Sequence, residues 1–174
     1  MQCVPITLRA IASVMWMALT VALIPSSNAF AQAPQSKFAE VNGVKLHYLV
    51  AGKGDPDAAV IHEAALLHGF AETSHMWRPL IAKLSDKHTV IAPDLRGFGQ
   101  SSAPEGGYTK KAMAQDIHAL VKSLKYDRIR LVGHDIGLMV AYAYAAQYPS
   151  EVDRIVLMEA FLPGVGEWNN VFLL

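Results

Sequence analysis

Cysteine is nearly absent from this chain of 174 residues, in which Cys3 is the only one. Cys3 lies in a segment that we expect to be removed, so the mature protein would have neither a disulfide nor a thiolate nucleophile. The compartment in which the protein works therefore cannot be inferred from its cysteine content. An excess of positive charge is also missing, since 15 basic residues balance 15 acidic ones. Without a basic face, nucleic acid is not an expected partner.

A hydrophobic run of membrane-spanning length is missing as well. The apolar run at residues 10–24 has 15 residues, whereas a spanning helix needs about 20. Arg9 precedes this run, and the small residues Ala29 and Ala31 follow it. This order is typical of a secretory signal peptide, and a retained N-terminal anchor is the alternative. We expect residues 1–31 to be the signal peptide and the protein to be secreted or periplasmic. After cleavage, the mature protein is not expected to associate with a membrane.

The rest of the chain has the length of one domain. We expect residues 32–36 to form a short polar linker, and residues 37–174 carry the regular patterns. Two alternating runs flank Asn42-Gly43, which is the strongest short signal for a β-hairpin. Helices are predicted after Ser74, a candidate N-cap, and over residues 109–126 and 136–148 from their apolar spacing.

The remaining apolar runs are predicted strands, and they alternate with these helices. This alternation predicts right-handed crossovers and an α/β three-layer sandwich, with a mostly parallel sheet and the N-terminal antiparallel hairpin at its edge. His68, Asp94, Asp135 and Glu159 each follow one of the predicted strands. Because ligands of such sheets bind beyond the carboxyl ends of the strands, these ends are expected to converge on one site.

The stretch from Gly133 to Gly137, with the sequence GHDIG, lies between a β-branched strand and an alanine-rich helix. It has the form of a nucleophile elbow with Asp135 at its centre. The helix N-terminus favours an anionic carboxylate at that position. A carboxylate that attacks a tetrahedral carbon displaces an alkoxide or a halide and leaves an ester that water cleaves. The alternative is that Asp135 only caps the helix.

Four motifs together resemble the α/β-hydrolase fold family, and within it the aspartate-nucleophile branch of epoxide hydrolases and haloalkane dehalogenases. They are HGF at 68–70, DLRGFGQS at 94–101, GHDIG at 133–137 and MEAFLP at 158–163. The resemblance covers residues 37–174 and includes secreted epoxide hydrolases of the cystic-fibrosis inhibitory factor type. Residues 57–65 lengthen the strand before His68 relative to that family, which indicates an insertion or a sequence error.

The resemblance implies that Asp135 is the nucleophile and that the backbone amides of Phe70 and Ile136 form the oxyanion hole. Glu159 matches the charge-relay acid of a subset of the family, and a solvent-facing glutamate is the alternative. The other motif residues are expected to support the structure: His68, Gly69, Asp94, Gly133, His134 and Gly137.

The resemblance also implies a water-activating histidine after the acid and a cap domain that protonates the opening oxygen. The last histidine of this chain is His134, beside the nucleophile. Histidine spacings such as His62 to His68 match no zinc pattern, and no metal or cofactor is expected. We therefore expect an N-terminal part of the hydrolase core, truncated before the cap and inactive by itself.

The expected reaction class is hydrolysis of a small-molecule epoxide through an alkyl-ester intermediate. Haloalkane and haloacetate dehalogenases are the alternative within the family, and they tend to place tryptophan or arginine after the nucleophile. Ile136 has no side-chain donor to hold a halide, which favours the epoxide. A non-catalytic fragment is the alternative outside enzyme chemistry.

Overall fold

The computed structural model describes residues 33–52 and 63–159. The expected signal peptide lies outside these residues, as do residues 57–62 of the lengthened strand and the end of the MEAFLP motif. Among the described residues, no helix is long and apolar enough to cross a membrane.

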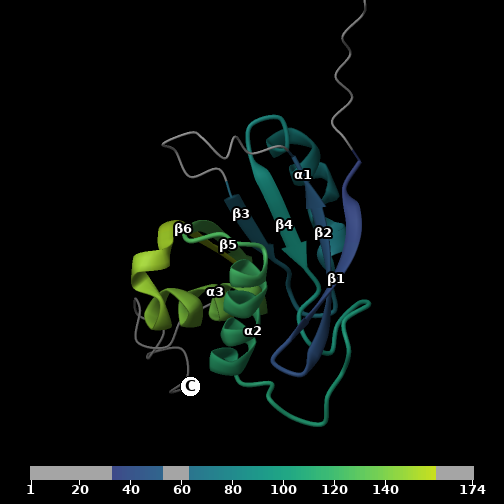
Figure 1. Cartoon of the computed structure of the whole chain (residues 1–174), viewed down its shortest axis with the longest axis vertical. Helices are drawn as coiled ribbons and strands as arrows, with labels where there is room; N and C mark the ends of the chain where they lie inside the picture. Colours follow the sequence, from purple (N-terminus) through teal and green to yellow (C-terminus); the bar gives the residue numbers. More distant parts are fainter. Residues whose placement is uncertain (1–32, 53–62, 160–174) are drawn as a thin grey trace, which may run out of the picture.

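Six strands form one sheet in the order β1-β2-β4-β3-β5-β6 (Figure 1). Their bounds are β1 Gln35–Val41, β2 Val44–Ala51, β3 Glu63–Leu67, β4 Thr89–Pro93, β5 Ile129–His134 and β6 Val152–Met158. β1 pairs antiparallel with β2, and β2 pairs antiparallel with β4. The pairings of β4, β3, β5 and β6 are parallel. The predicted mostly parallel sheet with an antiparallel hairpin at its edge is confirmed.

The hairpin turn has the geometry that its sequence predicts. Asn42 and Gly43 have φ of 49° and 74°, both in the left-handed region. A two-residue turn of this kind matches the twist of the flanking strands, and Asn-Gly is the pair that adopts it most readily. The turn fixes the register of β1 on β2, so that Phe38 lies opposite His47.

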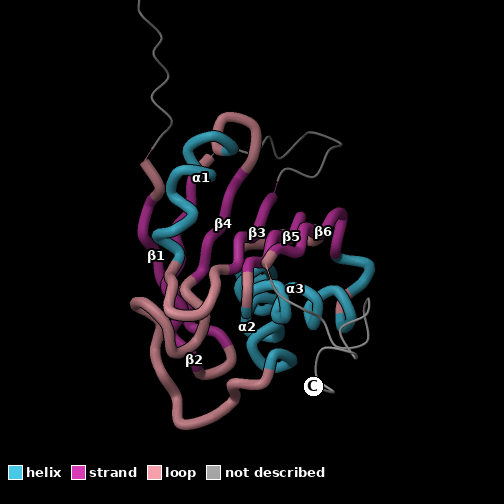
Figure 2. Tube along the Cα trace, turned by 180° about the vertical axis from the view of Figure 1, so that it is seen from behind, coloured by secondary structure: helices cyan, strands magenta, loops and turns pink. Residues whose placement is uncertain are grey.

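Helices cover both faces of the sheet, which confirms the three-layer arrangement. The helices are α1 Arg78–Leu84, α2 Lys110–Ser123 and α3 Ile136–Gln147, with 3₁₀ turns η1 Ser74–Trp77 and η2 Pro149–Glu151. α2 and α3 lie together on one face, and α1 lies on the other (Figures 1 and 2). The predicted cap at Ser74 is wrong, because the side chain of Thr73 caps η1 by accepting the amide hydrogen of His75.

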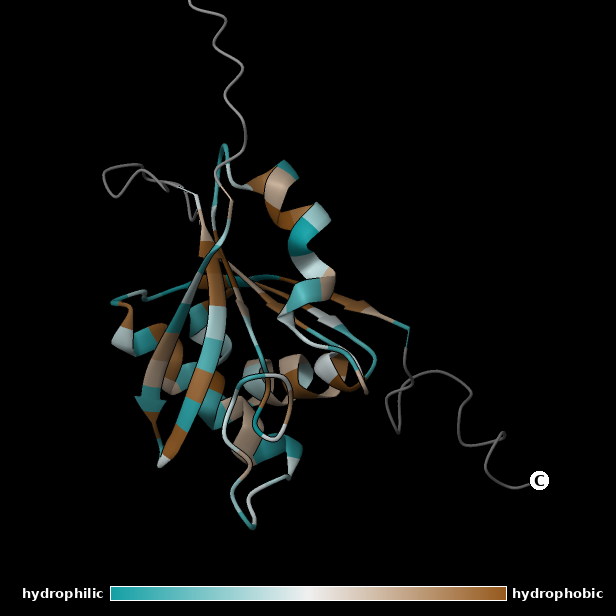
Figure 3. Cartoon of the chain, turned by 90° about the vertical axis from the view of Figure 1, so that its right-hand side faces the viewer, coloured by the Kyte–Doolittle hydropathy of each residue, from teal (hydrophilic) through white to brown (hydrophobic). Residues whose placement is uncertain are grey.

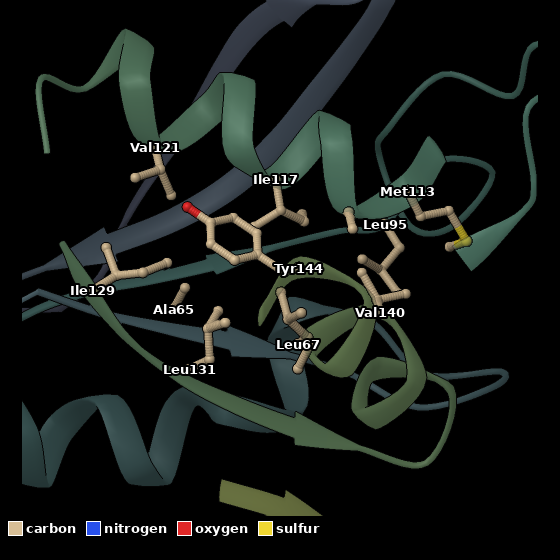
Figure 4. Close-up of a cluster of buried hydrophobic side chains, with 12 residues drawn as sticks. Ala65, Leu67, Leu95, Met113, Ile117, Val121, Ile129, Leu131, Val140 and Tyr144 are labelled. Carbon is tan, nitrogen blue, oxygen red and sulfur yellow. The ribbon is translucent and has the colours of Figure 1, made fainter. Parts of the chain in front are cut away.

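β3 shows how the sheet divides the core. Ala65 and Leu67 face α2 and α3, where they pack with Leu131 and the fully buried Tyr144 (Figure 4). Leu66 faces the opposite way, into the cluster beneath α1. Side chains alternate along a strand, so a strand covered on both faces is apolar at every position. Figure 3 shows the resulting hydrophobic stretches along the strands.

The loop after β4 is fastened to α2 by a buried ion pair. Arg96 Nε and Nη2 donate to the two carboxylate oxygens of Asp116, each over 2.6 Å. Both side chains are at least nine-tenths buried. The paired fork of two hydrogen bonds compensates the desolvation of both charges. It holds the segment that follows Asp94 against the helical layer.

Candidate active site

The elbow holds Asp135 in a strained conformation between β5 and α3. Its φ is 50° and its ψ is −122°, which a residue with a Cβ rarely adopts. The amide of Asp135 donates to the carbonyl of Met158 over 3.0 Å, and its carbonyl accepts from Leu138. These bonds tie the elbow to the end of β6 and to the first turn of α3.

The flanking glycines allow the close approach that the elbow requires. A Cβ on Gly137 would collide with the backbone carbonyl groups of Leu67 and His68 at the end of β3. A Cβ on Gly133 would lie 2.5 Å from the carbonyl oxygen of Gly137. Because backbone atoms are the obstacle in both cases, no side-chain rearrangement would relieve the contact.

The backbone amide of Phe70 meets the carboxylate of Asp135. Phe70 N donates to Asp135 Oδ2 over 2.9 Å, across 65 positions of sequence. The Phe70 side chain is 69% exposed, so its backbone is what engages Asp135. Ile136 is the first residue of α3, and its amide makes no hydrogen bond to the Asp135 carboxylate in the described structure. One of the two predicted donors is therefore in contact with Asp135.

Glu72 and His134 join the loop after β3 to the elbow. Glu72 Oε2 accepts from the amide of Gly69 over 2.9 Å and lies 3.1 Å from His134 Nδ1. A Cβ on Gly69 would lie 2.6 Å from Glu72 Oε2 and 3.1 Å from Asp135 Cβ. The absence of that Cβ lets the two segments close on each other, directly before the Phe70 amide.

His68 lies in a fully buried position beneath this loop. Its Nε2 accepts from the amide of Leu95 over 2.9 Å, so Nδ1 carries the hydrogen and donates to the carbonyl of Gly69 over 2.8 Å. Burial lowers the pKa of His68, and the opposing effects of Gly69, Asp94 and Glu72 are smaller. The ring is a neutral bridge between two loops, in agreement with a supporting role.

Asp94 is buried at the end of β4, where two backbone amides and one imidazole contact its carboxylate. Its carboxylate accepts from the amides of Ser74 over 2.6 Å and Gln100 over 2.9 Å, and from His47 Nδ1 over 2.8 Å. Burial acts to raise the pKa of Asp94, but the hydrogen bonds from Gln100, Ser74 and His47 outweigh it and lower the pKa. The glycine turn bends around this group, because a Cβ on Gly99 would collide with the carboxylate.

Glu159 follows β6 directly, on the strand next to the elbow. Its side chain is exposed and its φ is 64°, in the left-handed region. No hydrogen bond or ion pair engages its carboxylate among the described residues. The structure thus places Glu159 at the carboxyl edge of the sheet, as predicted, without an imidazole partner there.

The described residues contain no histidine bonded to Asp135. His47, His68, His118 and His134 each contact other groups. Nor do the described residues contain a group of three or more histidine, cysteine or acidic side chains that would hold a metal ion. Within residues 33–52 and 63–159, the carboxylate of Asp135 thus accepts one backbone hydrogen bond, from Phe70, and no imidazole is bonded to it.

The residues that surround Asp135 were predicted from the sequence, with the exception of Glu72. The structure brings Gly69, Phe70 and His134 to Asp135, whereas the carboxylate of Asp94 contacts β2 and η1 instead. The pair of Glu72 with His134 was missed. Its only signal in the sequence is the position of Glu72 three residues after Gly69, in the turn that follows the HGF motif.

The chain is similar in sequence to several known proteins. The sequence signature of the alpha/beta hydrolase fold matches residues 66–172. The chain is 39% identical over 134 residues to a soluble epoxide hydrolase of Corynebacterium sp. (strain C12), covering 77% of this chain and 44% of that protein. It is 32% identical over 130 residues to a fluoroacetate dehalogenase of Burkholderia sp., covering 72% of this chain and 40% of that protein.

Solved structures show the same likeness in three dimensions. The crystal structure of epoxide hydrolase VrEH1 from Vigna radiata superposes with a TM-score of 0.69 at 32% identity, covering 81% of this chain and 46% of that one. The chain spans less than half of the length of each of these three proteins.

Proposed function

The chain belongs to the α/β-hydrolase fold family, and on this basis we propose that it acts as an epoxide hydrolase-like protein with Asp135 as nucleophile. Oδ1 of Asp135 attacks a ring carbon of a small epoxide, and the bond from that carbon to the ring oxygen breaks. The oxygen stays on the other ring carbon as an alkoxide and takes a proton from water. The product of this step is an alkyl ester on Asp135.

The hydrogen bond from Phe70 N to Asp135 Oδ2 is the observation that carries this proposal. When Oδ1 becomes the ester oxygen, Oδ2 becomes the carbonyl oxygen that Phe70 already holds. Attack of water on the ester carbon moves negative charge onto Oδ2. A donor in this position typically lowers the barrier by about 3–4 kcal/mol. An aspartate that served only as a helix cap would have no need of a donor from a loop 65 positions away.

Dehalogenation is the second candidate, because the fluoroacetate dehalogenase of Burkholderia sp. is similar to this chain. A carboxylate nucleophile suits both reactions, which differ in the leaving group. Expulsion of a halide needs donors that stabilise it, and the aliphatic side chain of Ile136, next to Asp135, supplies none. This favours the epoxide.

Export of the mature protein remains part of the proposal. It rests on the charged, apolar and small-residue order of residues 1–31. Mass spectrometry of the protein from the secreting host should give a chain that begins at Gln32. A chain that retains its first 31 residues would refute the signal peptide.

The test of the nucleophile is the intact mass of the protein after incubation with epibromohydrin. An adduct should form on the wild type and on Asp86→Ala, an exposed aspartate that serves as the matched control, and should be absent from Asp135→Ala. Because no histidine lies against Asp135 in the described structure, we expect the ester to accumulate. A folded wild type that gains no adduct, or an adduct that survives Asp135→Ala, would refute the assignment.

A further inference from the structure

Three side chains form a second hydrogen-bonded relay away from Asp135. Ser36 Oγ lies 2.7 Å from His47 Nε2, and His47 Nδ1 lies 2.8 Å from Asp94 Oδ2. They come from β1, from β2 and from the end of β4, on the opposite side of β3 from the elbow. The hairpin register creates the first contact: Phe38 is opposite His47, and Ser36 is on the same face two residues away.

The hydrogen-bond pattern fixes which ring nitrogen of His47 carries the hydrogen. Asp94 accepts from two backbone amides, Ser74 N and Gln100 N, which favour the ionised carboxylate. A carboxylate only accepts, so Nδ1 of His47 is the donor. Nε2 then carries a lone pair and accepts from the hydroxyl of Ser36. A serine hydroxyl that donates to an imidazole oriented by a buried carboxylate is the arrangement that activates a serine nucleophile.

Burial is distributed along the relay as this chemistry requires. His47 and Asp94 are each 2% exposed, whereas Ser36 is exposed. The ring of Phe38 packs against that of His47, with 5.1 Å between the centroids, and limits its rotation. The acid and the base are thus buried, and the serine that contacts them lies at the surface.

A donor and a small pocket lie beside the relay. Gln100 Nε2 is 3.5 Å from His47 Nε2. A pocket of about 180 Å³ adjoins it, lined by His47, Leu49, Thr73, Arg78 and Gln100 among others. The base and the acid of the relay line this pocket, Ser36 does not, and its volume is below the about 300–1,000 Å³ of pockets for drug-sized ligands.

We propose that Ser36, His47 and Asp94 form a second nucleophilic centre, which attacks small activated esters independently of Asp135. Ser36 Oγ bonds to the carbonyl carbon while His47 Nε2 takes the hydroxyl proton. The ester oxygen leaves and receives that proton from His47, which yields the alcohol and an acyl-serine. Water, deprotonated by His47, then cleaves the acyl-serine into the carboxylic acid and free Ser36. The net reaction is ester plus water to acid plus alcohol.

The test uses a fluorophosphonate ester, in which Ser36 Oγ bonds to phosphorus while fluoride leaves with the proton. The intact mass of the full chain should rise by one phosphonyl group, and peptide mapping should locate it on Ser36. Ser150→Ala, which removes an exposed serine, is the matched control. Asp135→Ala tests independence from the elbow. Both variants should be labelled at the wild-type rate.

Ser36→Ala removes the nucleophilic oxygen and should abolish the label at this position. Circular dichroism checks that each variant is folded, and because Ser36 is exposed on an edge strand its replacement should leave the fold intact. His47→Gln should be labelled about 100-fold more slowly, the size of a typical general-base contribution, with Ser36 still present. Absence of label on the folded wild type, or equal labelling of Ser36→Ala, would overturn the proposal and leave the relay as a clasp between β1 and β4.

Discussion

Because the backbone is strained at Asp135, we predict that glycine at this position gives a more stable protein than alanine, the reverse of the usual preference. With φ of 50° and ψ of −122°, the residue at this position occupies a region that only glycine enters freely. Replacing Asp135 by glycine and, separately, by alanine removes the same carboxylate and the same bond to Phe70. The two variants then differ in whether a Cβ is forced into the strained conformation.

The expected difference follows from two opposing effects. Strain of this kind costs about 1–3 kcal/mol, and glycine relieves it. Glycine also loses about 0.5–1 kcal/mol more conformational entropy on folding than alanine does. The glycine variant should therefore be more stable than the alanine variant by about 0.5–2 kcal/mol. This corresponds to a difference in Tm of about 2–7 °C for a domain of this size.

Urea unfolding followed by circular dichroism measures this difference directly. Ala146→Gly is the matched control, because Ala146 is exposed on α3 and has ordinary helical surroundings. There the sign reverses, and glycine should cost about 1 kcal/mol. If Asp135→Ala were as stable as Asp135→Gly while the control behaved normally, the elbow would not be strained in solution.

Three further predictions concern groups that support the site. Because burial lowers the pKa of His68 in the fold, the unfolded chain binds the extra proton first as the pH falls. The free energy of unfolding should thus decrease below about pH 6.5, by up to about 1.4 kcal/mol per pH unit. Urea unfolding at pH 7 and at pH 5 measures this decrease, which should be smaller in His68→Gln than in the wild type. Asp116→Ala leaves Arg96 buried without its partner and should cost about 3–5 kcal/mol of unfolding free energy; a loss below 1 kcal/mol would contradict this. Gly137→Ala should cost about 3 kcal/mol or more, since its Cβ meets backbone carbonyls, and a Tm equal to wild type would show that the elbow yields.

Local backbone chemistry was readable in the sequence. Asn42-Gly43 predicted the hairpin because few other pairs accept positive φ at two successive positions. The spacing of apolar residues predicted α2, whose inward side chains include Met113, Ile117 and Leu120. The glycines around Asp135 predicted a tight elbow. Each of these signals depends on residues within one element, where the sequence order is also the spatial order.

The contacts that define the chemistry were decided by the tertiary structure. The amide of Phe70 reaches Asp135 across 65 positions, Glu72 reaches His134 across 62, and His47 reaches Asp94 across 47. No periodicity links such residues, because they meet only when the order of the strands brings their ends together. The sequence by itself determined that a strand, an aspartate and a helix follow one another at residues 129–147. Only the assembled sheet decided that, of the two amides expected there, Phe70 bonds to the carboxylate of that aspartate, and that Ser36 lies against His47.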